Sequence, residues 1–387
     1  MTDSFALYVH APFCVRKCRY CEFASEELRD TSQADEVVDG ILREARTRAC
    51  EEPWRDRTLH SLYLGGGTPS LLLPDQVLRL VYGLQEVFSL QEGAECTIEA
   101  NPGTLSPSRL DAWLELGLER VSLGVQSLQE SVLHTLGRIH TADLARRAYQ
   151  TLVDAGFPRI NVDLIFGTCT DKVFDGWRDT LDEVIRWQPE HVSAYSLILE
   201  KGTPLYHDHE RGLQVKVDEE IELQLFKYTI EALEEAGYLH YEVSNWAGSA
   251  RERSRHNLSY WDGSPYLAIG PAGHSFDGDR TRWWNHRDSQ QWLNMVQKEG
   301  SGKAAEEVLS PLMRYEEIIM LGLRMIEGVE EVRAVAAATD AGRDWPPESL
   351  DMLLERRLLL AEGGRIRFSR EGLMIADEVI AHLLRDV

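Results

Sequence analysis

Basic side chains are scarce in this chain of 387 residues, which has 41 Lys and Arg against 64 Asp and Glu and a formal net charge of -23. A field of that sign repels the phosphates of nucleic acids and anionic membrane surfaces, so we expect no nucleic-acid partner. Long apolar runs are absent too, because none approaches the roughly 18 residues of a membrane span. The first residues, MTDSFALYVHAPFC, lack the basic and apolar segments of a signal peptide. We therefore expect a cytoplasmic protein without a stable membrane span.

Cysteine is also infrequent, with six residues in the whole chain. Six could form three disulfides in a secreted protein, but Cys14, Cys18 and Cys21 fall within eight residues. That spacing suits one metal centre better than several bridges, and it favours a reducing compartment. The other cysteines are spread along the chain and are interpreted as small buried side chains: Cys50, Cys96 and Cys169.

The length predicts two or three domains, and the first half repeats a βα rhythm. Short apolar runs end in Gly, Pro or Asn and are followed by segments with helical periodicity. Six strands that alternate with helices predict an α/β fold with a parallel sheet and right-handed crossovers. The strands are expected at residues 7–10, 62–64, 97–100, 121–125, 160–166 and 192–199, and the helices include 34–49, 74–88, 106–115 and 141–155.

The rhythm changes after residue 199. Residues 218–236 predict one long helix, and an irregular stretch rich in Gly and Trp follows at 241–284. Residues 309–387 are mainly helical with one β-like piece at 365–369, a pattern that resembles a winged-helix module. The acidic balance favours a packing or cover domain over a DNA reader. We divide the chain into three units: 1–215, 216–300 and 301–387.

The run Cys14-Val-Arg-Lys-Cys18-Arg-Tyr-Cys21 directly follows the first expected strand. Three thiolates on one short loop can ligate three irons of a cubane cluster and leave the fourth iron open. The amino and carboxylate groups of S-adenosylmethionine (SAM) can chelate that open iron. The alternative is a structural zinc site, which needs four protein ligands and would take His10 as the fourth.

The segment YVHAPFCVRKCRYCEF resembles the opening of radical SAM proteins related to oxygen-independent coproporphyrinogen III dehydrogenase. The resemblance continues through most of the chain. It implies a [4Fe-4S] cluster on Cys14, Cys18 and Cys21. It also implies a partial (β/α)6 radical SAM barrel that binds SAM at the carboxyl ends of its strands, where βα barrels place their chemistry.

Several polar and glycine residues fall at or near those strand ends. Glycines after the second strand let the backbone approach a ligand closely. Glu99 could accept both hydroxyls of a ribose, and Asp163 is costly inside an apolar strand unless it is paired. His10 matches a family position near the cluster, with a packing role as the alternative. The resemblance assigns SAM contacts to Tyr8, Gly66, Gly67, Thr68, Glu99, Gln126, Arg138 and Asp163.

Two features bear on the subgroup. The dehydrogenases carry an N-terminal extension and another cysteine directly after the third ligand, whereas this chain begins shortly before Tyr8 and continues from Cys21 into Glu-Phe. The HNxxYW motif at residues 256–261 resembles the HemW-like heme chaperones. An imidazole is a natural axial ligand of heme iron, and aromatic rings can lie along a porphyrin face. The heme candidates are His256, Tyr260, Trp261 and, in GPAGHS, His274.

The first functional hypothesis is a heme-binding radical SAM protein that delivers heme to an acceptor protein. An electron donor such as a flavodoxin or ferredoxin would serve the cluster, and SAM cleavage is compatible with this role. The second hypothesis is oxygen-independent oxidative decarboxylation of two porphyrinogen propionates. A third is an inert cluster-bearing scaffold, which the intact SAM-contact residues disfavour. We expect no coproporphyrinogen dehydrogenase activity.

Overall fold

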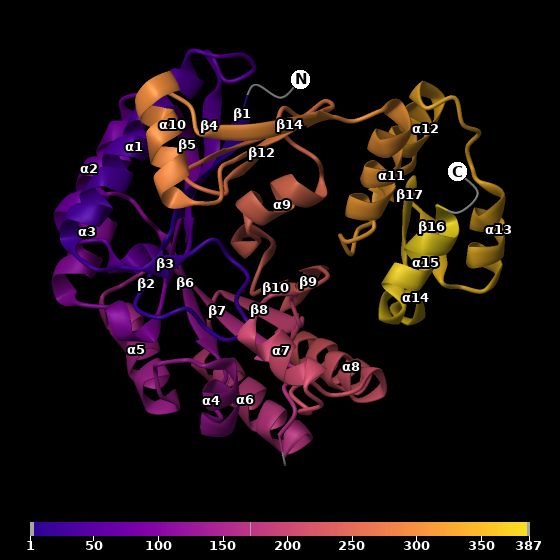
Figure 1. The fold of residues 1–387 in the computed structure, drawn as a ribbon. Helices are drawn as coiled ribbons and strands as arrows, with labels where there is room; N and C mark the ends of the chain where they lie inside the picture. Colours follow the sequence, from indigo (N-terminus) through magenta and orange to yellow (C-terminus); the bar gives the residue numbers. More distant parts are fainter. Residues whose placement is uncertain (1–3, 171, 385–387) are drawn as a thin grey trace.

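The computed structural model describes residues 4–170 and 172–384. Its main element is a twelve-stranded sheet that curves around the short helix α9 (Arg255–Trp261), with helices on the outer side (Figure 1). The strands of this sheet are β1 (Ser4–Ala11), β4 (Thr58–Gly66), β5 (Ser89–Ala100), β6 (Arg120–Gln126), β7 (Arg159–Phe166), β8 (His191–Ser196), β9 (Leu239–Glu242), β10 (Asn245–Ala247), β11 (Tyr266–Ile269), β12 (His274–Phe276), β13 (Thr281–Asn285) and β14 (Lys303–Val308).

The sheet order is β14-β13-β12-β11-β1-β4-β5-β6-β7-β8-β10-β9. The run from β1 through β4 to β8 is parallel and contains the six strands expected from the sequence. β11 adds a further parallel strand on the other side of β1, and the remaining neighbours pair antiparallel. Because the order ends at β14 and β9, the sheet is open. The expected α/β fold with a partial barrel is confirmed.

The helices of this part form where the sequence supplies caps and an apolar face. At the first helix, Asp30 accepts hydrogen bonds from the backbone N–H groups of Ser32 and Gln33 (2.9 and 3.1 Å), which satisfies two donors of the first turn. Val37 and Ile41, four residues apart, then face the sheet in the core. The helices are α1 (Thr31–Ala49), α2 (Pro74–Gln85), α3 (Pro107–Glu115), α4 (Glu130–Leu136), α5 (Ala142–Asp154), α6 (Val173–Trp187), α7 (Pro204–Glu210), α8 (Glu219–Glu235) and α10 (Ser289–Glu299).

Alternation along the parallel strands gives the sheet two unlike faces. In β6, Val121 and Leu123 pack in the core under the helices, whereas Ser122 points inward and donates to Asp163 on β7. The register Glu99–Ser122–Asn161 continues the inward row across β5, β6 and β7. Polar side chains therefore collect on the concave face, which positions the site.

The C-terminal part forms a separate unit with its own core around Tyr315, Ile319 and Leu353 (Figure 1). Its order is helix, strand, helix, helix, strand, strand, with the sheet order β15-β17-β16, which is the winged-helix arrangement expected. Backbone hydrogen bonds from Ile326 to Tyr241 of β9 and from Val243 to Arg324 tie this unit to the barrel edge. The elements are α11 (Pro311–Gly322), β15 (Val329–Glu330), α12 (Glu331–Asp340), α13 (Glu348–Glu355), β16 (Leu359–Glu362), β17 (Arg365–Phe368), α14 (Arg370–Met374) and α15 (Ala376–Leu383).

Residues 241–284 differ from expectation, because they contain α9 and the strands β10, β11 and β12 rather than an irregular stretch. These strands have three or four residues each. β11 and β10 pair with β1 and β8, which are distant in sequence, and β12 pairs with its neighbours β11 and β13. The division into three units stays a prediction, and the large sheet draws strands from residues 4 to 308. Within the described part of the chain, no helix combines the length and apolar composition needed to cross a bilayer.

Candidate functional site

The three cysteines lie on one loop beyond the carboxyl end of β1. Cys14 ends β2 (Phe13–Cys14), which pairs in parallel with β3 (Glu26–Glu27) and so closes the loop that carries Cys18 and Cys21. Over the residues described, no three His, Cys, Asp or Glu side chains are placed to hold a single metal ion. In a cubane, each protein thiolate binds a different iron.

A chain of hydrogen bonds runs beneath this loop from one sulfur to another. Thr68 Oγ1 donates toward Cys14 Sγ at 3.6 Å and accepts from Asn101 Nδ2 at 2.8 Å. Asn101 Oδ1 accepts from Arg138 Nη2, and Arg138 Nη1 donates to Cys18 Sγ at 3.5 Å. Donors aimed at sulfur stabilise thiolates and tune the potential of a cluster bound by them. The polar groups around Cys14 and Cys18 therefore fit an iron-sulfur centre.

His10 is buried beside this loop with both ring nitrogens engaged. Its Nε2 lies 2.7 Å from the carbonyl oxygen of Ala24, and its Nδ1 lies 3.2 Å from the hydroxyl of Tyr8. A carbonyl only accepts, so Nε2 carries the proton and Nδ1 accepts from the tyrosine. Burial lowers the pKa of His10 and keeps the ring neutral. The zinc alternative lacks its fourth ligand in this arrangement, and a packing role for His10 is supported.

The glycine run at the end of β4 brings the backbone against the cluster loop. Gly66 has a φ of +108°, and a carbon added to it would lie 2.6 Å from the ring of His10. A carbon added to Gly67 would lie 2.6 Å from the carbonyl oxygen of Phe13. No other residue fits these positions without displacing the loop. The glycines thus hold the loop close to the end of β4.

Glu99, on the concave face of β5, accepts hydrogen bonds from the hydroxyl of Tyr63 (2.9 Å) and the backbone N–H of Gly66 (3.0 Å). Burial, reinforced by the nearby charge of Asp163, raises the pKa of Glu99 to about 7. A carboxylate offers about four acceptor positions, so room remains for the hydroxyl donors of a ribose. Glu99 therefore fits the SAM contact assigned to it.

Gln126 ends β6 in a strained conformation. Its φ is +64°, in the left-handed region that residues other than Gly rarely adopt. The pairing of β6 with β7 also shifts register at this position. A carbon added to Gly124 would lie 3.0 Å from Gln126 Nε2 and 3.3 Å from Arg138 Nη2. Local strain of this kind is concentrated at functional sites. The structure brings Gln126 and Arg138 together over Gly124.

Asp163, on β7, lies on the same concave face as Glu99. It accepts from the Ser122 hydroxyl at 2.6 Å and from Asn161 Nδ2 at 2.8 Å. Burial raises the pKa of Asp163, and these neutral donors partly offset that effect. The carboxylate is therefore compensated by hydrogen bonds from neutral groups.

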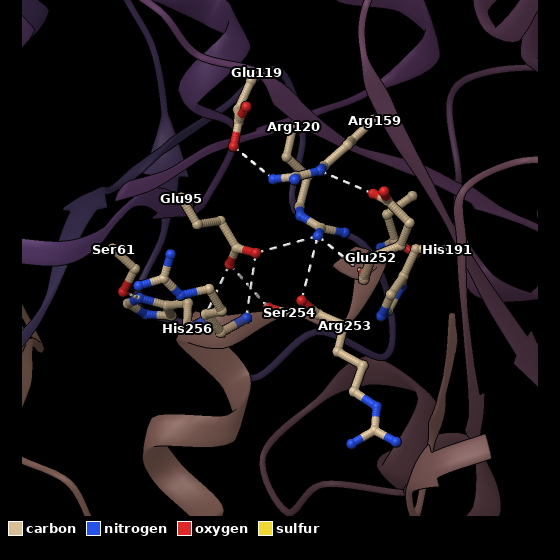
Figure 2. A network of polar contacts seen from close by, with 12 residues as sticks. Ser61, Glu95, Glu119, Arg120, Arg159, His191, Glu252, Arg253, Ser254 and His256 are labelled. Carbon is tan, nitrogen blue, oxygen red and sulfur yellow. Dashed lines mark hydrogen bonds and ion pairs between the residues drawn. The ribbon is translucent and has the colours of Figure 1, made fainter. Parts of the chain in front are cut away.

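The HNxxYW motif forms α9, which lies inside the barrel with a buried carboxylate at its N-terminus. Glu95 accepts from the backbone N–H groups of Arg255 and His256 (3.2 and 3.1 Å) and from the hydroxyl of Ser254 (3.3 Å) (Figure 2). Arg120 donates to Glu95 at 3.1 Å, and neither side chain is more than 2% exposed. A negative charge at a helix N-terminus is favourable. This network anchors the motif to β5 and β6.

His256 is 1% exposed and stacks on Tyr63, with ring centroids 4.8 Å apart. Its Nδ1 lies 3.0 Å from Ser61 Oγ, and its Nε2 lies 2.8 Å from the hydroxyl of Tyr260. Burial lowers the pKa of His256 to about 3, so the ring is neutral. An axial bond from His256 to iron would require one of these hydrogen bonds to break.

The second candidate ligand, His274, lies elsewhere. It is exposed at the start of β12 and stacks on Trp284, with ring centroids 5.9 Å apart. β11 separates β12 from β1, so the structure does not bring His274 and His256 together. Tyr260 meets His256 edge-on at 5.2 Å, and Trp261 ends α9. The motif and His274 are thus separate features of one concave face.

Several residues of these networks were missed in the sequence, among them Tyr63, Glu95, Asn101 and Arg120. A signal existed for Asn101, which follows the strand that carries Glu99 in TIEANP. Glu95 also alternates with Glu99 along β5, so both point to the same face. Arg120 begins an apolar strand, and its partner lies on another strand, which no local pattern reveals.

The chain is similar to known proteins along most of its length. The Radical SAM superfamily model matches residues 8–184. The chain is 32% identical to the heme chaperone HemW of Mycobacterium tuberculosis, covering 98% of this chain and 95% of that protein. It is 34% identical to the mitochondrial radical S-adenosyl methionine domain-containing protein 1 of Bos taurus, covering 98% of this chain and 87% of that protein. The coproporphyrinogen III oxidase HemN of Escherichia coli, a radical SAM enzyme, matches with a TM-score of 0.81 at 21% identity, over 99% and 90% of the chains.

The fold and the cysteine loop define a radical SAM protein, and the likeness to HemN supports the fold. Within that class, the chain belongs to the HemW family. Membership in the radical SAM superfamily implies SAM and a [4Fe-4S] cluster as cofactors. The donor set at the loop and the acceptors at the strand ends fit both.

Proposed function

We propose that this protein is a heme chaperone that binds heme and a [4Fe-4S] cluster and delivers heme to acceptor proteins. The observation that carries the proposal is the 32% identity to the HemW chaperone of Mycobacterium tuberculosis across 98% of the chain. The match includes the C-terminal unit and the HNxxYW helix as well as the barrel. A shared barrel alone would support only the cofactors, because one fold hosts many functions.

In this proposal Cys14, Cys18 and Cys21 hold the cluster, and SAM binds its open iron. A bound, reduced cluster supplies one electron for reductive cleavage of SAM. Glu99 accepts from the ribose, and Arg138, already anchored to Cys18, orients the carboxylate end of SAM beside the loop. The complete set of proposed SAM contacts is Tyr8, Gly66, Gly67, Thr68, Glu99, Gln126, Arg138 and Asp163.

For the heme, the exposed His274 is the stronger candidate for the axial bond to iron. Its ring is accessible, and Trp284 offers an aromatic face beside it. His256 instead uses both nitrogens inside the protein, which supports a positioning role for the motif helix. Tyr260 and Trp261 then act from α9 as aromatic neighbours of a bound porphyrin.

The cluster loop also suits a redox partner in the cytoplasm. Val15, Arg16 and Lys17 are exposed between the first two cysteines, in a chain whose overall charge is strongly negative. A local basic and apolar tip favours docking of a small acidic electron carrier such as a flavodoxin or ferredoxin. The loop would then pass the electron over a short distance to the cluster.

Titration with hemin and incubation with coproporphyrinogen together test the proposal. The anaerobically reconstituted protein should bind hemin with one-to-one stoichiometry, seen as a saturable Soret band. With SAM, a reductant and coproporphyrinogen III, it should release no protoporphyrinogen, because Glu22 and Phe23 stand where dehydrogenases carry a further cysteine. Decarboxylated product would establish the dehydrogenase alternative, and absence of hemin binding would overturn the chaperone proposal.

A further inference from the structure

A groove of about 400 Å³ separates the barrel from the C-terminal unit. One wall is the turn after α9, which includes Gly263 and Pro265, and the opposite wall includes Met325, Val329 and Arg333. The groove thus begins where the HNxxYW helix ends. Neither the cluster nor the SAM contacts belong to it.

Two guanidinium groups converge on Gly263 at the edge of this groove. Arg333 lines the groove, and Arg314 lies beside it and donates to the carbonyl oxygen of Gly263 at 3.4 Å. A carbon placed on Gly263 would lie 3.0 Å from Arg333 Nη2 and 3.1 Å from Arg314 Nη2. The side chain of Arg314 is only 12% exposed. Burial, with the adjacent charge of Arg333, lowers the pKa of Arg314. Two neighbouring cations in a partly desolvated place repel one another and favour an anion between them.

The acidic groups nearby compensate the charge of Arg314 only in part. Glu317 is 3.9 Å from Arg314, but one of its oxygens accepts from Arg282. Glu330 pairs with Arg365 at 2.8 Å. Within the described ranges, the side chain of Arg333 has neither a hydrogen bond nor a carboxylate within 4.0 Å.

The acids of the neighbouring turns, Asp277 and Asp279, favour the charged form of Arg314 but form no ion pair with it among the described residues. Asp262 accepts from the backbone N–H of Ser264 at 2.8 Å. Asp277 accepts from the backbone N–H groups of Asp279 (2.8 Å) and Thr281 (3.0 Å). Carboxylates used inside a turn give the guanidinium groups little direct pairing. An external anion is therefore the missing partner.

A row of mostly buried aromatic rings connects the guanidinium groups to the motif helix. Arg314 lies over the ring of Phe276, 4.7 Å from its centroid. Phe276 contacts Tyr266 (6.0 Å), which meets Tyr260 of the motif edge-on at 4.8 Å. Pro265, Met325 and Val329 add apolar contact in the groove. A ligand that joins carboxylates to a flat apolar ring matches this combination.

We propose that the groove binds the propionate carboxylates of a tetrapyrrole through Arg314 and Arg333. The inference rests on the proposed function and extends it to the acid groups of the heme. Guanidinium groups bind carboxylates in a planar, bidentate manner, which gives orientation as well as affinity. The propionates would fix the porphyrin at the seam between the barrel and the C-terminal unit.

Titration with protoporphyrin IX and with its dimethyl ester, followed by porphyrin fluorescence, tests this site without iron coordination. Arg333→Gln should weaken binding of the free acid about tenfold or more, as expected for loss of a charge-assisted hydrogen bond. The ester should bind weakly and equally to the wild type and to this variant. Arg356→Gln removes the same charge from an exposed position outside the groove and should change nothing. Arg314→Lys keeps the positive charge but loses the planar pair of guanidinium donors. Its affinity for the free acid should lie between those of the wild type and Arg333→Gln, with an unchanged melting temperature.

Each contrary result has a distinct meaning. If Arg333→Gln binds the free acid as the wild type does, the groove assignment is overturned while the heme proposal stands. If inorganic pyrophosphate binds the groove without displacing protoporphyrin, the groove belongs to a phosphorylated ligand and the assignment is likewise overturned. If the wild type binds neither hemin nor protoporphyrin IX, the proposed function fails and the groove assignment fails with it.

Discussion

Asn101 donates a hydrogen bond to Thr68 over 2.8 Å. Through this contact the side-chain amide of Asn101 connects the surroundings of Cys14 and Cys18. Thr68 faces Cys14, and the other end of the amide accepts from Arg138, which faces Cys18. The end of β5 is thereby coupled to both sides of the cluster loop.

Asn101→Ala should weaken the cluster while leaving its three ligands in place. The change removes two hydrogen bonds and leaves Thr68 and Arg138 short of a partner, at a cost of about 1–3 kcal/mol. We expect cluster loss to a chelator to be about tenfold faster, measured by the decay of visible absorbance. Asn294→Ala, at an exposed position of α10, is the control and should decay like the wild type.

Replacement of Cys14, Cys18 or Cys21 by Ala should abolish the cluster, because each thiolate holds one iron. The reconstituted wild type should carry about four irons and absorb broadly near about 400 nm. Ala at Cys50 or Cys169 should leave both properties unchanged. Iron and sulfide retained by a triple variant of the loop would contradict the cluster assignment.

SAM affinity should depend on pH through Glu99. Its pKa of about 7 in the folded protein lies above the unfolded value of about 4.3, so this group contributes stability below pH 4.3 that is lost as pH rises through 7. Ribose hydroxyls favour the ionised form, so SAM binding should strengthen about tenfold from pH 6 to pH 8 and release a proton. Calorimetry in buffers of different ionisation enthalpy measures both effects.

Glu99→Gln is the matched variant for that experiment. It should bind SAM about tenfold or more weakly, with little dependence on pH, since a charge-assisted hydrogen bond is lost. Asp163→Asn should also weaken SAM binding and leave the cluster intact. Unchanged dissociation constants in both variants would remove these carboxylates from the SAM site.

The two heme-candidate histidines should behave differently. His274→Ala should shift the Soret band of the hemin complex, because it removes a protein ligand that solvent replaces poorly. His256→Ala should keep the band position and lower the free energy of unfolding by about 2–4 kcal/mol, through a buried cavity and two lost hydrogen bonds. A Soret shift in His256→Ala alone would return the axial bond to the motif helix.

Glu95→Ala should destabilise the protein strongly. It leaves the buried Arg120 unpaired and α9 without its N-terminal carboxylate, an effect of about 3–5 kcal/mol. Glu119→Ala is the control, because Glu119 is partly exposed and its partner Arg159 keeps Glu252 at 2.8 Å (Figure 2). The control should cost about 1 kcal/mol or less in a thermal melt. Equal losses of stability in the two variants would show that the buried Glu95–Arg120 pair contributes no more than the partly exposed Glu119–Arg159 pair.

Local patterns in the chain predicted the parallel half of the fold with few errors. The apolar runs that became β1 and β4 to β8, and the capped segments that became α1 and α5, each carry their own signal over several residues. The strands β10 to β13 have three to five residues, and no such short run in a Gly- and Trp-rich segment has a distinctive period. β10 and β11 form because the distant strands β8 and β1 supply their hydrogen-bond partners, and β12 and β13 extend the sheet from β11.

The candidate site divides in the same way. The spacing of Cys14, Cys18 and Cys21, and the positions of Glu99 and Asp163 along their strands, were determined by the sequence, because ligand spacing and alternation are local properties. Only the tertiary structure decided that His256 lies buried under Tyr63 with both nitrogens engaged, since its partners come from other strands. The convergence of two arginines on Gly263 is likewise a product of packing between distant segments. Whether a side chain is free to bind a ligand depends on which other residues contact it, and those contacts form only when the chain folds.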